Sequence, residues 1–312
     1  MTARSSAASP ASDEPQLQVV RLHGADVAFV DLPGAAEGPA SPIVALHGLG
    51  ANSSHWLPAA ELLAGRGHRV IVPDLPGHGR SGNGPGDYSL GTLASSVRDL
   101  LDHLGLATCT LVGHSMGGGI ALQFAYQFPQ RLDAVALLDA GGLGTETSSA
   151  LRWLARPGSG LVLAAAFNSA TVGALEAAAR RWPLGGSRTP PDLLSDASLA
   201  RFRELADPDH REAFLSMLRS VVDGGGQRVS AVERLSVLSD TPTLIIWGAH
   251  DHILPVAHGD RAHAALPHST LVVLPDAGHD PHLDAPDLVA ELIDELARHR
   301  ALTLRQTAPP PA

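Results

Sequence analysis

One serine in this chain lies in a sequence context that favours nucleophilic chemistry. Ser115 is the centre of the pentapeptide Gly113-His114-Ser115-Met116-Gly117, which has the pattern G-x-S-x-G. The apolar run Cys109–Val112 precedes it, and a segment of small and apolar residues at helical spacing follows. We therefore expect a strand, a sharp turn and a helix, with Ser115 Oγ held clear of a sheet at the helix N-terminus. The alternative for the pentapeptide alone is an ordinary glycine-rich turn.

A catalytic serine needs partners, because its hydroxyl is a poor nucleophile at neutral pH. It requires a base that removes its proton and a carboxylate that holds that base in one tautomer. Asp251 and His279 each follow a short apolar run, and the order Ser, Asp, His is the one associated with a serine on such a turn. We predict Ser115 as nucleophile, His279 as base and Asp251 as the orienting acid. Asp139 stays open as an alternative acid and His282 as an alternative base.

The negative charge that develops on a carbonyl oxygen also needs hydrogen-bond donors. The backbone N–H of Met116, directly after the serine, is one candidate. The second is the N–H of Leu49 in the loop His47-Gly48-Leu49-Gly50, which follows the apolar run Ile43–Leu46. His47, Gly48 and His114 are therefore also expected near the substrate.

The elements that must position these residues alternate along the chain. Short, largely apolar runs at 43–46, 70–72, 109–112, 135–138, 243–247 and 271–274 predict buried strands, and helical stripes lie between several of them. Such alternation indicates an α/β fold with a mainly parallel sheet. Because loops at the carboxyl ends of parallel strands form the ligand crevice, the candidate residues are expected to meet there.

The alternation stops between two halves of this pattern. Residues 16–144 and 241–304 are predicted to form the core, and 145–240 an inserted helical cap with helices near 150–154, 161–181 and 208–222. The triple glycine at 224–226 predicts a turn. Large side chains of the cap are candidates for an apolar substrate pocket: Trp153, Phe167, Trp182, Phe202, Phe214 and Met217. The segments 1–15 and 305–312 are expected to be disordered tails.

Composition limits the classes of partner. The chain has 312 residues and a net charge of −10, and its basic residues do not cluster, so we expect neither nucleic acid nor a membrane surface as a partner. The single Cys109, in a predicted strand, excludes an internal disulfide. The N-terminal segment lacks the apolar run of a secretory signal, which favours a cytoplasmic protein. Oligomeric state is not predicted.

Five segments together carry a resemblance to a known family. The segments are His47–Gly50, Asp74–Ser81, Gly113–Gly118, Trp247–Asp251 and Gly278–Pro286. In order and spacing they closely resemble those of the α/β-hydrolase superfamily, in the branch of serine hydrolases with a helical cap. The resemblance implies an eight-stranded α/β-hydrolase fold with flanking helices, Ser115 as nucleophile, His279 as base and Asp251 as acid. It implies no cofactor.

The expected reaction is hydrolysis of a carboxylic ester or lactone of a small, largely apolar molecule through an acyl-enzyme on Ser115. Carbon–carbon hydrolysis of a ring-cleavage diketone is an alternative, which the run Ser115–Gly118 also resembles, and acyl transfer is another. A small-molecule receptor is the alternative outside enzymes. The run His250-Asp251-His252 offers possible metal ligands, but no third ligand has suitable spacing, so no metal is predicted.

Overall fold

A computed structural model of the chain describes residues 17–35, 41–83, 87–181 and 195–298. Both predicted tails, 1–15 and 305–312, lie outside the described residues, and so does Trp182.

The main body is built on an eight-stranded sheet with strand order β1-β2-β4-β3-β5-β6-β9-β10. All neighbours from β4 to β10 are parallel, whereas β1 pairs antiparallel with β2 and β2 with β4. The strands are β1 Leu17–Leu22, β2 Ala25–Leu32, β3 Ile43–Leu46, β4 Val70–Pro73, β5 Cys109–His114, β6 Leu132–Leu138, β9 Thr243–Gly248 and β10 Thr270–Leu274. This confirms the predicted mainly parallel sheet. The central strands β3, β4, β5 and β9 are buried along their whole length, which explains why their sequences are almost wholly apolar.

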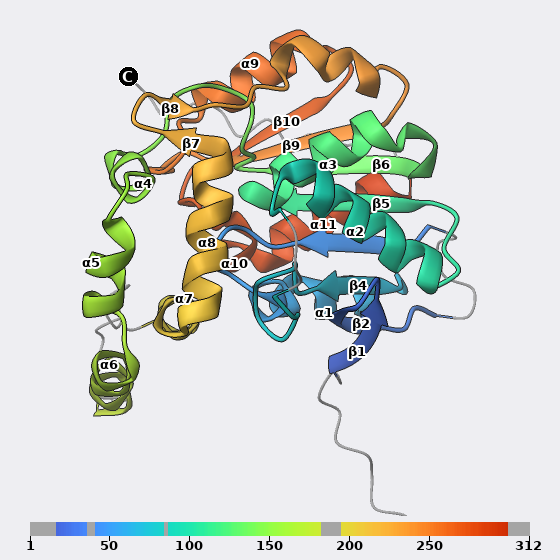
Figure 1. The fold of residues 1–312 in the computed structure, drawn as a ribbon. Coiled ribbons are helices and arrows are strands. Elements are labelled where there is room, and N and C mark those ends of the chain that lie inside the picture. Colours follow the sequence, from blue (N-terminus) through green and yellow to red (C-terminus); the bar gives the residue numbers. More distant parts are fainter. Residues whose placement is uncertain (1–16, 36–40, 84–86, 182–194, 299–312) are drawn as a thin grey trace, which may run out of the picture.

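Helices cover both faces of the sheet and give a three-layer arrangement (Figure 1). On one face, α2 (Leu90–His103), α3 (Met116–Gln127) and α9 (Ala257–Ala265) contribute to one hydrophobic core. On the other, α1 (Leu57–Gly65) packs against α11 (Pro286–Ala297) in a second core. Short helix α10 (Pro281–Asp284) precedes α11. The two cores fix the sheet rigidly, so loops at its edge are held in defined positions.

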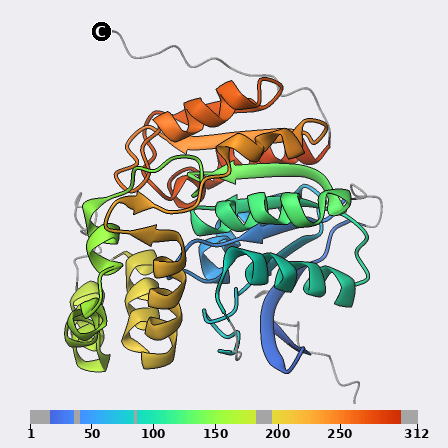
Figure 2. The same cartoon turned by 45° about the horizontal axis from the view of Figure 1, so that its top comes forward.

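Five helices between β6 and β9 stand beside the carboxyl ends of the strands (Figures 1 and 2). They are α4 (Ser149–Leu154), α5 (Ser159–Ala166), α6 (Ser169–Arg181), α7 (Asp196–Ala206) and α8 (Pro208–Val221). The two-stranded hairpin β7 (Val222–Asp223) and β8 (Gly226–Gln227) follows α8, with its turn at the triple glycine as predicted. The inserted segment therefore has the helical character that the sequence indicated.

The cap differs from the prediction in three details. The single helix predicted over 161–181 is two helices, because Phe167 is extended (φ −116°, ψ 100°) and the Asn168 side chain accepts hydrogen bonds from the N–H groups of Ala170 and Thr171. Helix α7 was not predicted. The 3₁₀ segment Val232–Leu238 buries Leu235 and Leu238 in the core beside α3 and α9, so the end of the inserted segment packs with the main body.

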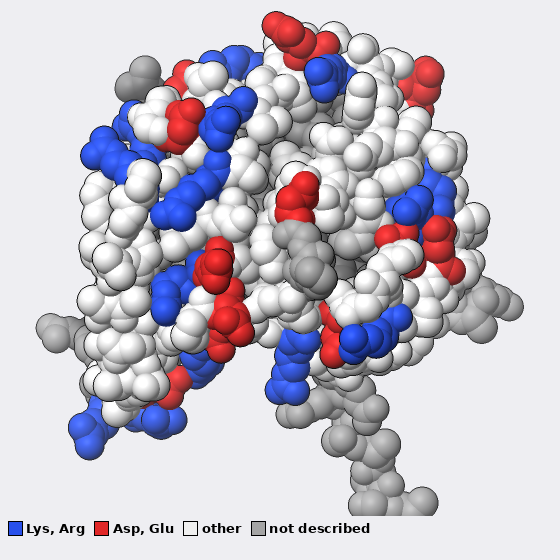
Figure 3. All heavy atoms as spheres, in the orientation of Figure 1, with Lys and Arg blue, Asp and Glu red and all other residues white. Residues whose placement is uncertain are grey.

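Charged side chains of both signs are interspersed on the surface. Figure 3 shows basic and acidic residues next to one another on one face. Ion pairs of the described residues include Arg131 with Asp102 at 2.7 Å and Arg261 with Glu146 at 2.8 Å. Among the described helices, none is by itself long and apolar enough to cross a membrane; α5 and α6, bent by 47°, meet that test only as a pair.

Candidate active site

The backbone at Ser115 has a strained conformation. Ser115 lies between β5 and α3 with φ 53° and ψ −116°, outside the regions that a side-chain-bearing residue normally adopts. The flanking glycines permit this turn: a Cβ on Gly113 would lie 2.3 Å from the Gly117 carbonyl oxygen, and a Cβ on Gly117 would lie 2.5 Å from the Leu46 carbonyl oxygen. The strain holds the serine side chain away from the sheet, which is typical of a functional site.

The structure brings the three predicted side chains into one hydrogen-bonded line. Ser115 Oγ lies 3.0 Å from His279 Nε2, and His279 Nδ1 lies 2.8 Å from Asp251 Oδ2. Because a carboxylate only accepts, Nδ1 carries the proton and Nε2 is free to accept the serine proton.

The Asp251 side chain is buried. Its other oxygen accepts from the N–H groups of Ile253 (2.7 Å) and Leu254 (2.9 Å). Although burial opposes ionisation, the hydrogen bond and charge of His279 lower the pKa of Asp251.

A cavity of about 210 Å³ opens onto Ser115 and His279. Its wall is largely apolar and comes from both the main body and the cap, including Leu49, Met116, Leu151, Phe214 and Leu218. A volume below the range of roughly 300–1,000 Å³ common for ligand pockets suits a small molecule. Met116 is the first residue of α3, so its N–H has no partner within the helix, and both Met116 and Leu49 border the cavity.

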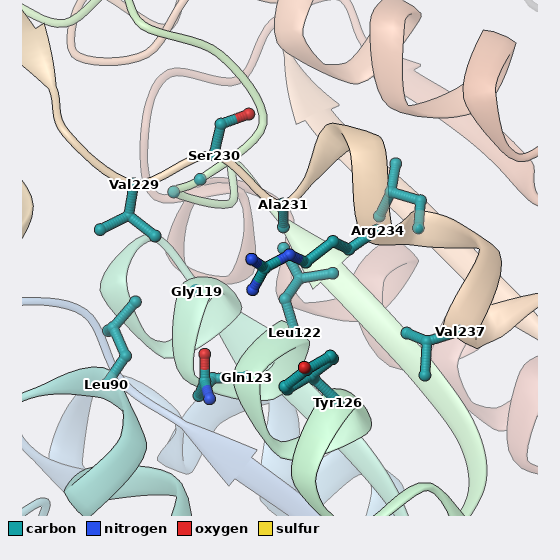
Figure 4. Close-up of a pocket in the computed structure, with 13 residues that line it drawn as sticks. Leu90, Gly119, Leu122, Gln123, Tyr126, Val229, Ser230, Ala231, Arg234 and Val237 are labelled. Carbon is teal, nitrogen blue, oxygen red and sulfur yellow. The ribbon is translucent and has the colours of Figure 1, made fainter.

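A second, smaller pocket of about 50 Å³ lies along the outer side of α3 (Figure 4). It is lined by Leu90, Leu122 and Tyr126, and the Arg234 guanidinium lies 5.3 Å from the Tyr126 ring centre. None of Ser115, His279 and Asp251 borders it, so the first cavity is the candidate site.

Two buried histidines hold the loop that carries Leu49. His47 Nε2 accepts from the Leu75 N–H at 2.9 Å, and His78 Nε2 accepts from the Gly50 N–H at 3.1 Å. Burial lowers the pKa of His47 to about 4 and that of His78 to about 3, so both are neutral acceptors at neutral pH. Asp74 adds two contacts, since its carboxylate accepts from the N–H groups of Ser53 (2.7 Å) and Arg80 (2.8 Å). The prediction that His47 lies near the substrate is therefore wrong, because its ring is fully buried. His47 instead supports the loop.

His114 lies beneath the base. Its Nε2 lies 2.6 Å from the His279 carbonyl oxygen, so this nitrogen must carry a proton and donate. Burial lowers the pKa of His114 to about 3, which keeps the ring neutral. The His282 ring is not near Ser115 Oγ as a base would be; it stacks on Trp56 at 4.4 Å and contacts His114 at 4.5 Å.

The predicted pocket residues of the cap separate into two groups. Phe214 lines the cavity, as Gly48 and His114 do. Trp153 and Phe167 do not: Trp153 is 43% exposed on the outer side of α4, and Phe167 stacks on Phe202 at 4.8 Å within the cap. Met217 is buried in the core beneath. Helical spacing predicts which residues share the apolar face of a cap helix. It does not predict whether that face is turned towards the cavity.

Comparison with known proteins shows which family this fold belongs to. Residues 41–286 match the family model described as alpha/beta hydrolase fold. The chain belongs to the α/β-hydrolase family.

Several relatives of this α/β-hydrolase differ in their described activities. It is 37% identical over 298 residues to an uncharacterized protein of Mycobacterium tuberculosis, with 94% of this chain and 85% of that protein covered. It is 33% identical to a dihydrolipoyllysine-residue acetyltransferase component of the acetoin cleaving system of Pseudomonas putida, covering 83% of this chain and 64% of that protein. It is 29% identical to a 2-hydroxy-6-oxo-6-phenylhexa-2,4-dienoate hydrolase of Burkholderia cepacia, covering 80% and 84%.

A solved structure gives the same fold. A thermophilic esterase from Thermogutta terrifontis superimposes with a TM-score of 0.68 at 27% identity, covering 91% of this chain and 98% of that one.

Several residues that line the cavity of this α/β-hydrolase were not predicted from the sequence, and one of them, an arginine, is charged. Arg201 of α7 borders the cavity and forms a 2.5 Å ion pair with Asp280, next to His279. The sequence does contain a signal for the start of helix α7, because Ser195 caps its N-terminus by accepting from the Ser198 N–H. That Arg201 faces the cavity follows only from how α7 is placed.

Two clusters of the described residues have ligand atoms close enough to share a cation: Asp139 with Asp251 and His279, and His114 with Asp280 and His282. In the first, both ring nitrogens of His279 are already bonded to Asp251 and Ser115. In the second, His114 donates to a carbonyl and Asp280 is paired with Arg201. These contacts account for the clusters without a metal.

Proposed function

We propose that this protein is a serine hydrolase that cleaves a carboxylic ester or lactone of a small, largely apolar substrate through an acyl-enzyme on Ser115. The observation that carries the proposal is the continuous chain from Ser115 Oγ to His279 (3.0 Å) and from His279 to Asp251 (2.8 Å) at the mouth of an apolar cavity.

The first step is attack of Ser115 Oγ on the substrate carbonyl as His279 Nε2 takes the serine proton. Asp251 stabilises the imidazolium that forms, because its carboxylate is negatively charged and accepts a hydrogen bond from the Nδ1–H group. The N–H groups of Met116 and Leu49 stabilise the oxyanion, a contribution of roughly a hundred- to thousandfold for each donor. His279 then protonates the leaving alcohol.

The acyl-enzyme is released by water in the same site. His279 Nε2 removes a proton from the water as it attacks the acyl carbonyl, and the proton then returns to Ser115 Oγ. The cavity wall contributed by Leu151, Phe214 and Leu218 would contact the apolar part of the substrate and limit its size.

Carbon–carbon hydrolysis is the second candidate, and one observation favours it. The substrate named for the Burkholderia cepacia relative is a dienoate, which carries a carboxylate, and Arg201 places a guanidinium at the cavity. However, Asp280 already pairs with that guanidinium and offsets its charge. A neutral ester is therefore the better fit.

A fluorophosphonate probe tests the nucleophile. We expect it to label wild-type protein at Ser115 and not Ser115→Ala, and we expect the variant to lose ester hydrolysis by roughly a thousandfold or more. Ser148→Ala, a substitution at the N-cap of α4 outside the triad, is the matched control. Labelling at another residue would overturn the assignment.

A substrate panel separates the candidates. Short-chain aryl esters, small lactones and a ring-cleavage dienoate are compared by kcat/KM, with an alcohol acceptor added in a parallel series to detect acyl transfer. Faster turnover of the dienoate would favour carbon–carbon hydrolysis, and tight binding without turnover of any compound would favour a receptor.

A further inference from the structure

A second buried carboxyl group lies beside the proposed triad. Asp139 directly follows β6, is fully buried and has φ 42°, a conformation that non-glycine residues seldom adopt. Its N–H donates to the Ile246 carbonyl at 3.0 Å, and its Oδ1 accepts from the Gly248 N–H at 3.0 Å. Asp139 is thus anchored to β9, the strand that leads to Asp251.

The remaining oxygen of Asp139 faces another acceptor. Oδ2 is buried and has no N–H or O–H donor within the part of the chain that the structure describes. The charged group that acts most strongly on the Asp139 side chain is the carboxyl of Asp251. Oxygens of the two carboxyls and a ring nitrogen of His279 all lie within 4.8 Å of one another. Two ionised carboxylates at this separation repel each other and neither can donate a hydrogen bond, so a proton on one of them removes the repulsion and supplies a donor.

The other contacts decide which carboxyl keeps the proton. Asp251 accepts three hydrogen bonds, from His279 Nδ1 and from the N–H groups of Ile253 and Leu254. Asp139 accepts one, from Gly248. Donors stabilise the ionised form, so the negative charge belongs on Asp251.

The surroundings of Asp139 act in the same direction. Its burial, followed by the hydrogen bond and charge of Asp251, raises the pKa of Asp139 far above its ordinary value. The charge of Asp280 adds to that effect, while the Gly248 N–H opposes it. His279 and His258 both interact with the charge of Asp251.

We propose that Asp139 is a positioning residue that stays protonated at neutral pH and donates a hydrogen bond to the Asp251 carboxylate, so that the two carboxyls share one negative charge. The expected effect on kinetics rests on the proposed function, whereas the protonation of Asp139 does not. The hydrogen bond from Asp139 fixes the plane of the Asp251 carboxylate. It also draws part of the carboxylate charge away from His279. When His279 takes the serine proton, Asp139 keeps its own.

Asp139→Asn tests the proposal because an amide has the size of the acid, donates through N–H and keeps an oxygen for Gly248. We expect kcat/KM for an ester at pH 7 to remain within about threefold of wild type. At alkaline pH we expect the wild type to lose activity as Asp139 ionises beside Asp251. We expect no such loss in the asparagine variant. If Asp139 were instead the ionised acid of the triad, the same substitution would lower kcat by roughly 10⁴-fold. Asp133→Asn, the same change at the start of β6, is the matched control.

Infrared spectroscopy gives a readout that does not depend on turnover. At pH 8 we expect the C=O band of a protonated carboxylic acid in wild type, in Ser115→Ala and in Asp133→Asn, and its loss in Asp139→Asn. Absence of this band from wild type, or its survival in Asp139→Asn, would overturn the proposal. If Asp139→Asn does not fold, Asp251→Asn replaces it: a change of acceptor must shift the band, and an unshifted band contradicts the contact. Wild type that shows the band but hydrolyses no ester would refute the proposed function alone.

Discussion

At the scale of single residues, the site depends on side chains that do not touch the reacting atoms. Neutral His114 donates to the His279 carbonyl, and neutral His78 accepts from Gly50 in the loop that carries Leu49. Neutral His47, itself in that loop, accepts from the Leu75 N–H in the loop after β4. Each imidazole therefore fixes a backbone segment whose N–H group or side chain the chemistry would use. Misplacement of such groups by about 1 Å is enough to cost roughly a hundredfold in rate.

His114→Phe tests this arrangement at residue scale. A flat aromatic ring is kept, but the donor to the His279 carbonyl is lost, so we expect kcat to fall by about 10- to 100-fold while KM changes little. Steady-state kinetics on the best ester of the panel measure both values. A large rise in KM with kcat unchanged would show instead that His114 contributes mainly to substrate binding.

At the scale of elements, one carboxylate of the cap joins α7 to two loops of the main body. Glu204 accepts from Asn52 Nδ2 (3.0 Å) and from the Gly79 N–H (3.1 Å), and its Oε2 lies 2.9 Å from His210 Nδ1 on α8. Asn52 and Gly79 belong to the loops after β3 and β4, so Glu204 fixes the cap beside the candidate oxyanion donors. Arg201, one turn earlier on α7, is placed at the cavity by the same docking.

Glu204→Gln tests the docking of α7. Burial opposes ionisation of Glu204, but hydrogen bonds with His210, Asn52 and Gly79 lower its pKa to about 2. Its ionised form therefore stabilises the fold above its ordinary pKa of 4.5, and this contribution is lost as pH falls from there towards 2. We expect the variant to lose at most about 3 kcal/mol of unfolding free energy at pH 7.

Chemical denaturation across pH measures this effect. The difference between wild type and Glu204→Gln must shrink as the pH falls below 4.5. Exposed Glu212→Gln on α8 is the control and should leave the profile unchanged. A constant difference at every pH would show that the charge of Glu204 does not contribute.

At the scale of the whole molecule, several histidines are buried in neutral form around the candidate site. Burial lowers the pKa of His47 to about 4 and those of His78 and His114 to about 3, and it lowers that of His282 well below 6.5. The unfolded chain takes up protons at these positions below pH 6.5, whereas the folded chain does not. Stability is therefore complete above pH 6.5 and falls as the pH drops towards the folded values.

Urea unfolding at pH 7 and pH 5 measures this loss, which can reach about 1.4 kcal/mol per pH unit for each histidine. In His78→Gln the amide can still accept from the Gly50 N–H but does not titrate, so we expect a shallower decline by that amount. His23→Asn, at an exposed position in the turn between β1 and β2, should retain the wild-type decline. Equal stability of wild type at pH 7 and pH 5 would contradict the expectation.

The sequence by itself determined the fold family and the order of the core elements. Buried parallel strands are almost wholly apolar, and the turn at Ser115 requires glycines at 113 and 117, so both leave local patterns that can be read directly. The predicted residues Ser115, His279 and Asp251 follow the carboxyl ends of three parallel strands, which the topology forces to one edge of the sheet.

Only the tertiary structure decided which side chains face the cavity. Trp153, Phe167 and Phe214 have the same apolar character, yet only Phe214 borders the cavity, because the docking of each cap helix sets its direction. The pairing of Asp139 with Asp251 likewise depends on a contact between residues more than a hundred positions apart. Such contacts arise from packing between elements, and spacing along the chain carries no record of them.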